Sequence, residues 1–213
     1  MNIIQDKILI ERSSKNFIDN LLNKHPGWKI LDIGCGYTAH EKATVVCDVQ
    51  DLSHFYKNKN FVKLETNNLP FKDKEFDFVI ASHVIEHVKD VRTFISELER
   101  VSSKGYIELP TILEDNLVFE NKKDHIWHTE FDDIEKKLKI SEKLQYLEPV
   151  LTVSSAKKLF KVFRQSLVLE LYWENNINFD LIEINNKSFE KISRLTLFRK
   201  FLSKIVRNII RKN

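Results

Sequence analysis

Two aspartates and two glycines near the start of the chain have the types and spacing of a ligand-binding loop. Asp32 stands just before Gly34, Gly36 follows after Cys35, and Asp48 comes 12 residues after Gly36. Glycine has no Cβ, so the backbone can turn sharply there and a ligand can lie against it. The two carboxylates can accept hydrogen bonds from hydroxyl or amino groups. The loop therefore predicts a site for a small polar ligand.

Two ligand classes compete for this loop. Residues 34–39 satisfy the dinucleotide pattern G-x-G-x-x-A, in which a helix N-terminus faces a pyrophosphate and an acid follows about 20 residues on. Here Asp48 comes too early, and residues 37–43 leave room for little more than one helical turn. S-adenosylmethionine has no pyrophosphate and needs no such helix. Its ribose hydroxyls would bind Asp48, and its amino group would bind Asp32 directly or through water.

Histidines in two later segments are candidates for acid–base chemistry. His83 and His87 follow one expected strand, and His125 and His128 flank Trp127 in an irregular segment. A hydroxyl acceptor must lose its proton when it attacks an electrophile, which calls for a base with a pKa near neutral. We expect His83 and His128 to be catalytic, and His125 and Trp127 to contact the substrate. For the second pair, a surface loop or packing under Trp127 remains the alternative.

The elements that must position these side chains alternate between strand and helix, which predicts a parallel sheet in an α/β domain. The expected strands are 28–33, 44–48, 61–64, 76–81 and 106–110. Helices are expected over 3–24, 91–103, near 131–139 and over 154–164. Strands 167–173 and 179–184 are expected to form a hairpin across Asn175 and Asn176. The carboxyl ends of the parallel strands then share one edge of the sheet, where such folds bind ligands.

A second block resembles a known signature. Residues 67–88 read NNLPFKDKEFDFVIASHVIEHV and resemble the L-P-F…F-D-x-V…E-H-V signature of class I S-adenosylmethionine-dependent methyltransferases, in particular the group called methyltransferase domain type 11. Residues 101–105 are similar to the family's R-V-x-x-x-G turn. The resemblance covers roughly residues 28–110, with the motifs in the family's order.

The resemblance implies S-adenosylmethionine as cofactor and a Rossmann-like α/β fold. That fold is a mostly parallel seven-stranded sheet with an antiparallel hairpin at its end, followed here by a C-terminal amphipathic helix. The implied cofactor contacts are Asp32, Gly34, Cys35, Gly36, Asp48, Glu65, Thr66, Asn67 and Ser82. Asp32, Gly34 and Gly36 would line the methionine end, Asp48 would bind the ribose, and Glu65, Thr66 or Asn67 would lie near the adenine. Ser82 would lie between cofactor and substrate. A third loop glycine of the family is missing, and Thr38 stands near its place.

The arrangement His83-x-x-Glu86-His87 also resembles the E-x-x-E-H pattern of the ubiquinone-biosynthesis O-methyltransferases, which is associated with a divalent ion. Histidine and carboxylate ligands suit zinc or similar ions. The E-H pair is common in members without a metal, in which the histidine holds a local turn. No metal site is therefore predicted.

The charge distribution separates the end of the chain from the rest. Seven basic residues and no acidic one follow position 193, which leaves residues 1–193 with a net charge of −4, because the whole chain carries +3. We expect a methyltransferase domain over 1–187 with a substrate lid at about 111–150, and a basic amphipathic helix over 188–213. That helix could lie on an anionic membrane surface or pack on the core or on a second subunit. A nucleic-acid partner is not expected, because such proteins more often carry a basic face on the folded body.

The sequence shows no signal-peptide pattern, no spanning apolar run and only two cysteines, so a cytoplasmic setting is expected, with peripheral membrane contact as an option. The expected reaction is O-methylation of a small molecule or a lipid-linked sugar or glycan by in-line displacement. The glycan acceptor rests on likeness to methyltransferases among surface-polysaccharide enzymes. Two alternatives stay open, a cofactor-binding module without catalysis and an NAD-dependent oxidoreductase. The oligomeric state is not determined by the sequence.

Overall fold

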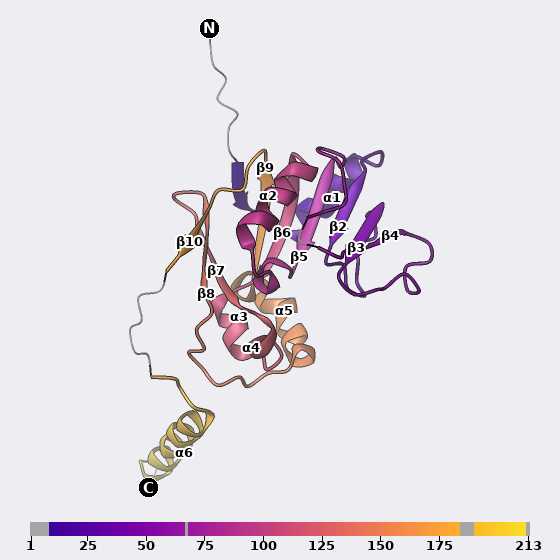
Figure 1. Cartoon of the computed structure of the whole chain (residues 1–213). Coiled ribbons are helices and arrows are strands. Elements are labelled where there is room, and N and C mark those ends of the chain that lie inside the picture. Colours follow the sequence, from indigo (N-terminus) through magenta and orange to yellow (C-terminus); the bar gives the residue numbers. More distant parts are fainter. Residues whose placement is uncertain (1–8, 67, 184–189, 212–213) are drawn as a thin grey trace.

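A seven-stranded sheet forms the centre of this computed structural model, which describes residues 9–66, 68–183 and 190–211 (Figure 1). Five strands run parallel, in the spatial order β6-β5-β2-β3-β4. They are β2 (Ile30–Ile33), β3 (Val45–Asp48), β4 (Asn60–Lys63), β5 (Phe78–Ser82) and β6 (Lys104–Pro110). The central strands β2 and β3 are buried at every residue, as expected for parallel strands covered on both faces.

Two further strands, joined by antiparallel pairings, complete the sheet at one end. β9 (Val168–Glu174) pairs with β6, and β1 (Leu9–Arg12) pairs with β9. The expected Rossmann-like α/β fold class is confirmed. Strand order reverses direction between β2 and β5, and at such a switch point the carboxyl ends of the strands leave a crevice for ligands.

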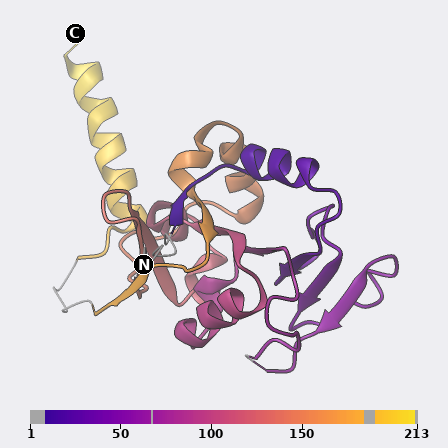
Figure 2. The same cartoon turned by 90° about the horizontal axis from the view of Figure 1, so that it is seen from above.

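The helices α1 (Lys15–Lys24) and α2 (Val91–Val101) cover opposite faces of this sheet (Figure 2). Residues Phe94, Ile95 and Leu98 of α2 pack on one core cluster, whereas Ile18 and Leu22 of α1 pack on the other. Adjacent strand residues alternate between the two clusters, because successive side chains in a strand point to opposite faces. The loops at the carboxyl ends of the strands are thus held by a sheet that is covered on both faces.

The helix expected over 3–24 begins only at Lys15, and residues 9–12 form a strand instead. Ile10 lies buried where β1 pairs with β9. The Ser14 side chain accepts a hydrogen bond from the N–H of Phe17 and so caps α1 at its N-terminus. The part of that prediction before Leu9 falls outside the described residues.

A second, three-stranded sheet overturns two further predictions. It consists of β7 (Trp127–Asp132), β8 (Lys137–Glu142) and β10 (Phe179–Ile182), in the order β10-β8-β7. The helix near 131–139 is wrong, because the Asp132 carboxylate accepts the N–H groups of Ile134 and Glu135 and turns the chain into a hairpin. The hairpin between 167–173 and 179–184 is also wrong, since β9 pairs with β6 while β10 pairs in parallel with β8. Position 184 of that prediction lies outside the described residues.

Four further helical elements lie near the carboxyl edge of the large sheet. They are η1 (Ile85–His87), α3 (Ile112–Leu117), α4 (Asn121–Asp124) and α5 (Val153–Leu167). The N–H of Ile126 donates to the carbonyl of Glu86, and the indole of Trp127 donates to the carbonyl of Val88. The second half of the chain is thereby fastened to the segment that follows β5.

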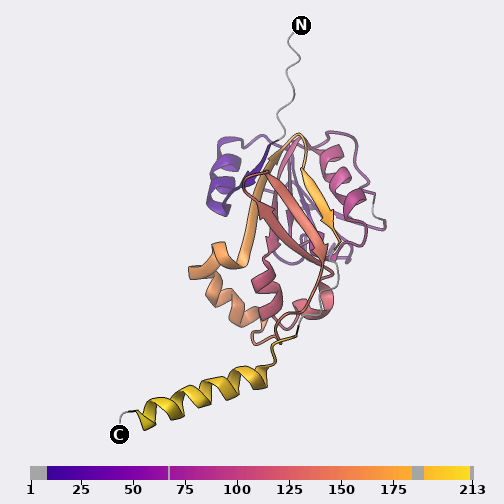
Figure 3. The same ribbon diagram turned by 90° about the vertical axis from the view of Figure 1, so that its left-hand side faces the viewer.

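The C-terminal helix α6 (Arg194–Ile210) projects away from the rest of the protein, and all its side chains are exposed (Figure 3). Its first turn touches the body, where Arg194 pairs with Glu148 and lies over the ring of Phe119. The alternative that its apolar side packs on the core of this chain is therefore wrong. Within the described part of the chain, no helix is both long enough and apolar enough to cross a membrane.

Candidate functional site

Two cavities lie along the carboxyl edge of the parallel strands and meet at Gly34 and His83. The first, of about 710 Å³, is lined by the glycine loop, α1 and the ends of β5 and β6. The second, of about 650 Å³, is lined by the end of β3, the segment after β4 and the η1 region. Each has the size of a small-molecule site, and their junction lies at the switch point of the sheet.

The glycine loop is a tight turn and not the start of a helix. Residues 34–44 contain no helix, as the short spacing to Asp48 suggested. The N–H of Gly34 donates to the carbonyl of Cys47, and the N–H of Gly36 donates to the Asp48 carboxylate at 2.9 Å. Gly34 has φ +63°, and a Cβ there would lie 2.5 Å from Cγ2 of Val84. The turn thus requires glycine because of both its backbone angle and its neighbour.

Cys35 and Cys47 are both free and buried. Cys35, a predicted cofactor contact, lines the first cavity. Burial raises the pKa of its thiol to about 12, so it stays neutral at physiological pH.

Asp32 is a buried carboxylate at the wall of the first cavity. One oxygen accepts the N–H of His40 at 2.6 Å. Burial raises the pKa of Asp32 to about 6, although the hydrogen bond from His40 and the charge of Lys59 act in the opposite direction. A positively charged ligand group beside this carboxylate would compensate the cost of its burial.

Asp48 lies at the second cavity, where it also holds the loop. Its two oxygens accept the N–H groups of Gly36 and Gln50, both at 2.9 Å. Thr66 lines the same cavity together with apolar side chains. Glu65 instead pairs with Lys63 at the surface and lines neither cavity. The third predicted adenine contact, Asn67, lies outside the described residues.

His83 sits between two carboxylates at the junction of the cavities, directly after Ser82, which lines the first cavity. Its Nδ1 lies 3.2 Å from Glu86 and its Nε2 lies 3.3 Å from Glu108. Burial alone would lower the pKa of His83, but these carboxylates raise it to about 10. His83 therefore carries its proton at neutral pH, which does not fit the expected general base. Both N–H groups of the cation face these carboxylates, so it can act on an acceptor through its charge.

The other predicted base, His128, is buried and lines neither cavity. Burial lowers its pKa to about 4, and its Nε2 has no hydrogen-bond partner among the described residues. His125 and Trp127, the predicted substrate contacts, lie against η1 instead. The ring of His125 packs on that of His87, and Trp127 bonds to Val88.

Sequence reasoning missed Glu108 and Arg164. Glu108 pairs with Ser82 in the sheet register and accepts Nη2 of Arg164 at 2.6 Å. Burial alone would raise the pKa of Glu108, but His83 and Arg164 lower it to about 2. An acidic residue within the apolar strand 106–109 was the available signal, because a buried charge in a strand needs a specific partner.

Comparison with known proteins agrees with the location of this site. A family model described as a methyltransferase domain matches residues 31–107. An uncharacterized protein of Methanocaldococcus jannaschii is 27% identical, over 68% of this chain and 68% of its own length.

Two solved structures are similar at lower identity. A protein from Pyrococcus horikoshii is 17% identical, with a TM-score of 0.44 over 74% of this chain and 87% of that one. An S-adenosylmethionine-dependent methyltransferase from Mesorhizobium loti is 18% identical, with a TM-score of 0.37 over 43% of this chain. The match spans only 50% of the length of the Mesorhizobium protein.

Proposed function

We propose that this chain, which carries a class I S-adenosylmethionine-dependent methyltransferase domain with its family match over residues 31–107, methylates an oxygen of a small molecule or a lipid-linked sugar. The observation that carries this proposal is the pair of cavities that meet at Gly34 and His83. One can hold an adenosine beside Asp48, while the other offers a buried carboxylate, Asp32, to an amino group. A turn without a helix suits a cofactor without a pyrophosphate.

The bound cofactor supplies an electrophilic methyl group on a sulfonium centre. The chain must then hold the acceptor in line with that centre and keep water away. Asp32 and Asp48 would fix the two ends of the cofactor, and the backbone of Gly34 would form the floor between them. The imidazolium of His83, held between Glu86 and Glu108, would place a positive charge beside the acceptor oxygen and so help to position it.

Calorimetry with S-adenosylmethionine, followed by an assay for release of S-adenosylhomocysteine with sugar and phenol acceptors, tests this proposal. We expect Asp48→Ala to weaken cofactor binding about tenfold to a hundredfold, because a ribose hydrogen bond to a charged group is lost. Glu65→Gln is the matched control, since Glu65 lines neither cavity and its removal should leave affinity unchanged. Binding without release for every acceptor would favour an inactive binding module. Absence of binding would contradict the proposal.

The exposed helix α6 supports a peripheral membrane contact for the same enzyme. Its apolar residues Phe198, Phe201, Leu202, Ile205 and Ile209 are all exposed, and Arg199, Lys200, Lys204, Arg207 and Arg211 accompany them. A basic amphipathic helix of this kind binds anionic lipid surfaces through buried apolar area and charge attraction. Such a contact would bring the cavities near a lipid-linked acceptor.

Flotation with liposomes measures this contact. We expect the full chain to float with vesicles that contain anionic lipid and not with neutral ones, and truncation after Ile192 to abolish flotation. Phe198→Ser with Phe201→Ser keeps every charge and should also abolish it, because the apolar insertion is lost. If the protein fails to float and instead runs as a dimer that truncation converts to a monomer, the helix binds a second subunit.

A further inference from the structure

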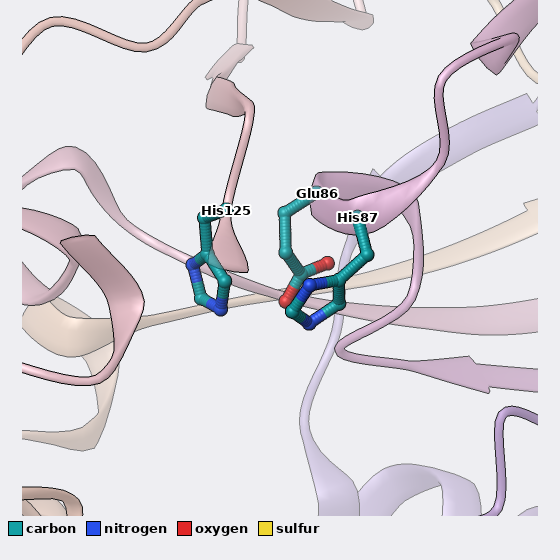
Figure 4. A group of neighbouring side chains, drawn as sticks. All are labelled: Glu86, His87 and His125. Atoms are coloured by element: carbon teal, nitrogen blue, oxygen red, sulfur yellow. The ribbon is translucent and has the colours of Figure 1, made fainter. Parts of the chain in front are cut away.

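Three side chains from two separate segments converge beside the second cavity. Glu86 and His87 belong to η1, and His125 follows α4 (Figure 4). Potential ligand atoms of all three lie within 4.8 Å of one another. His87 and Asp124 line the cavity that also contains Asp48. The cluster is therefore accessible from the second cavity, beside the proposed cofactor site.

Glu86 has an oxygen that the protein leaves unsatisfied. The residue is fully buried, with 0% of its surface exposed. Its Oε1 lies near His83, but its Oε2 has no hydrogen-bond partner among the described residues. A buried carboxylate oxygen without a hydrogen-bond partner is unfavourable, because it has lost its hydration without gaining another donor. A cation beside Oε2 would remove this cost.

Both imidazole rings are held in the orientation of metal ligands. Nδ1 of His87 lies 2.8 Å from the carbonyl of Asp124, and Nδ1 of His125 bonds to the carboxylate of Asp115. Because these acceptors require a proton on Nδ1, each ring presents Nε2 as a lone-pair donor. Metal-bound histidines almost always use their second nitrogen in this way, often on a buried carboxylate. Asp115 is itself fully buried and would keep His125 in this tautomer.

We propose that Glu86, His87 and His125 bind a divalent ion of the zinc type. Two imidazoles and one carboxylate form the donor set of catalytic zinc sites, which keep a fourth position open. The exposed side of His87 leaves that position accessible. Ligand atoms around zinc lie about 3.4 Å apart for bonds near 2.1 Å, so the side chains must close by about 1 Å on binding. The earlier expectation of no metal is replaced by this proposal.

The ion would also act on the acceptor. A hydroxyl in the open position would have its pKa lowered by the metal, and its proton would pass to water in the second cavity. This role, unlike the ion site itself, rests on the proposed function. The ion would then lie beside the acceptor oxygen and assist its attack on the methyl group.

Titration of the chelator-treated full chain with ZnCl₂ and CoCl₂ tests the site. We expect one ion per chain by calorimetry, and visible Co²⁺ absorption of the tetrahedral type. His87→Ala and His125→Ala should each weaken binding at least about a hundredfold, because a ligand is lost. Asp115→Asn should weaken it about tenfold to a hundredfold, since it removes the acceptor that orients His125. His54→Ala is the matched control, because His54 is exposed and outside the cluster.

His87 is exposed, so His87→Ala should remain folded, and circular dichroism of each variant verifies this. No binding of either ion at millimolar concentration, or equal affinity in wild type, His87→Ala and His125→Ala, would overturn the proposal. S-adenosylmethionine affinity is measured on the same samples. Loss of the ion with normal cofactor binding contradicts only the metal site, whereas a bound ion without cofactor binding contradicts only the proposed function.

Discussion

Replacing Asp32 with Asn is expected to make the ligand-free protein more stable at neutral pH. The carboxyl is buried, and its pKa in the native state is about 6 instead of the ordinary 3.8. Above about pH 6 Asp32 is ionised in both states, but its charge is buried in the native state and hydrated in the unfolded chain. This difference lowers the free energy of unfolding by about 3 kcal/mol. Asn removes the charge while its oxygen can still accept the N–H of His40.

The pH dependence gives the sign of this effect. Because the native pKa is raised, the native state binds more protons than the unfolded state between about pH 4 and 6, so stability falls as pH rises through that range. Urea unfolding should therefore show Asp32→Asn more stable than wild type by up to about 3 kcal/mol at pH 7.5. The difference should vanish below about pH 3, where Asp32 is protonated in both the native and the unfolded state. An equal difference at both pH values would contradict the assignment.

The same variant should bind S-adenosylmethionine about tenfold to a hundredfold more weakly, because a hydrogen bond to a charged group is lost. S-adenosylhomocysteine keeps the amino group but lacks the sulfonium charge. If Asp32 contacts the amino group, as we propose, both ligands lose the same factor. A loss confined to S-adenosylmethionine would instead place Asp32 beside the sulfur.

Gly34→Ala is expected to be the most destabilising single change in the loop. It places a Cβ 2.5 Å from Cγ2 of Val84 at a backbone φ of +63°. The left-handed angle alone costs about 1–2 kcal/mol for a residue with a side chain. The overlap adds about 1–3 kcal/mol, because the strand end and Val84 must move apart. The displaced loop would also weaken cofactor binding.

Gly36→Ala provides the matched control for this effect. Gly36 has φ +48°, but a Cβ there would meet no atom within 4 Å. It shares the backbone strain without the overlap, so its cost in urea unfolding should be smaller. Val84→Ala should recover part of the stability of the Gly34→Ala variant. If both glycine variants lose the same free energy of unfolding and Val84→Ala restores none of it, Val84 does not restrict the loop.

The parallel half of the fold was predictable because its signals are local. Apolar runs followed by Asp32, Asp48 and Ser82 mark three strand ends, and the class of fold places such ends on one edge. The second half was not predictable in the same way. Residues 131–139 combine helix-forming residues with Ile134 and Leu138 four positions apart, yet Ile134 is 94% exposed. The Asp132 side chain turns the backbone there, and local turn bonding of this kind competes with a helix.

The pairing of strands also depends on contacts that no local pattern reports. Asn175 and Asn176 suggested a hairpin, but β9 lies between β6 and β1, and β10 completes the smaller sheet. His83 lines both cavities, whereas its partner Glu108 lies on a neighbouring strand, 25 residues further along. The pKa of a histidine depends on such partners, so its base role could not be judged from the sequence.

The two oxygens of Glu86 have a consequence for how ligands in this protein influence one another. Oε1 lies beside His83 at the junction of the cavities, and the same carboxylate has an oxygen within 4.8 Å of ligand atoms of His87 and His125. A cation bound by one oxygen of Glu86 withdraws charge from the other oxygen. Binding of an ion at the cluster therefore changes the binding free energy of an acceptor beside His83, and the reverse also holds. Thermodynamic reciprocity makes that coupling free energy identical in both directions. One buried carboxylate thus links acceptor positioning to ion occupancy.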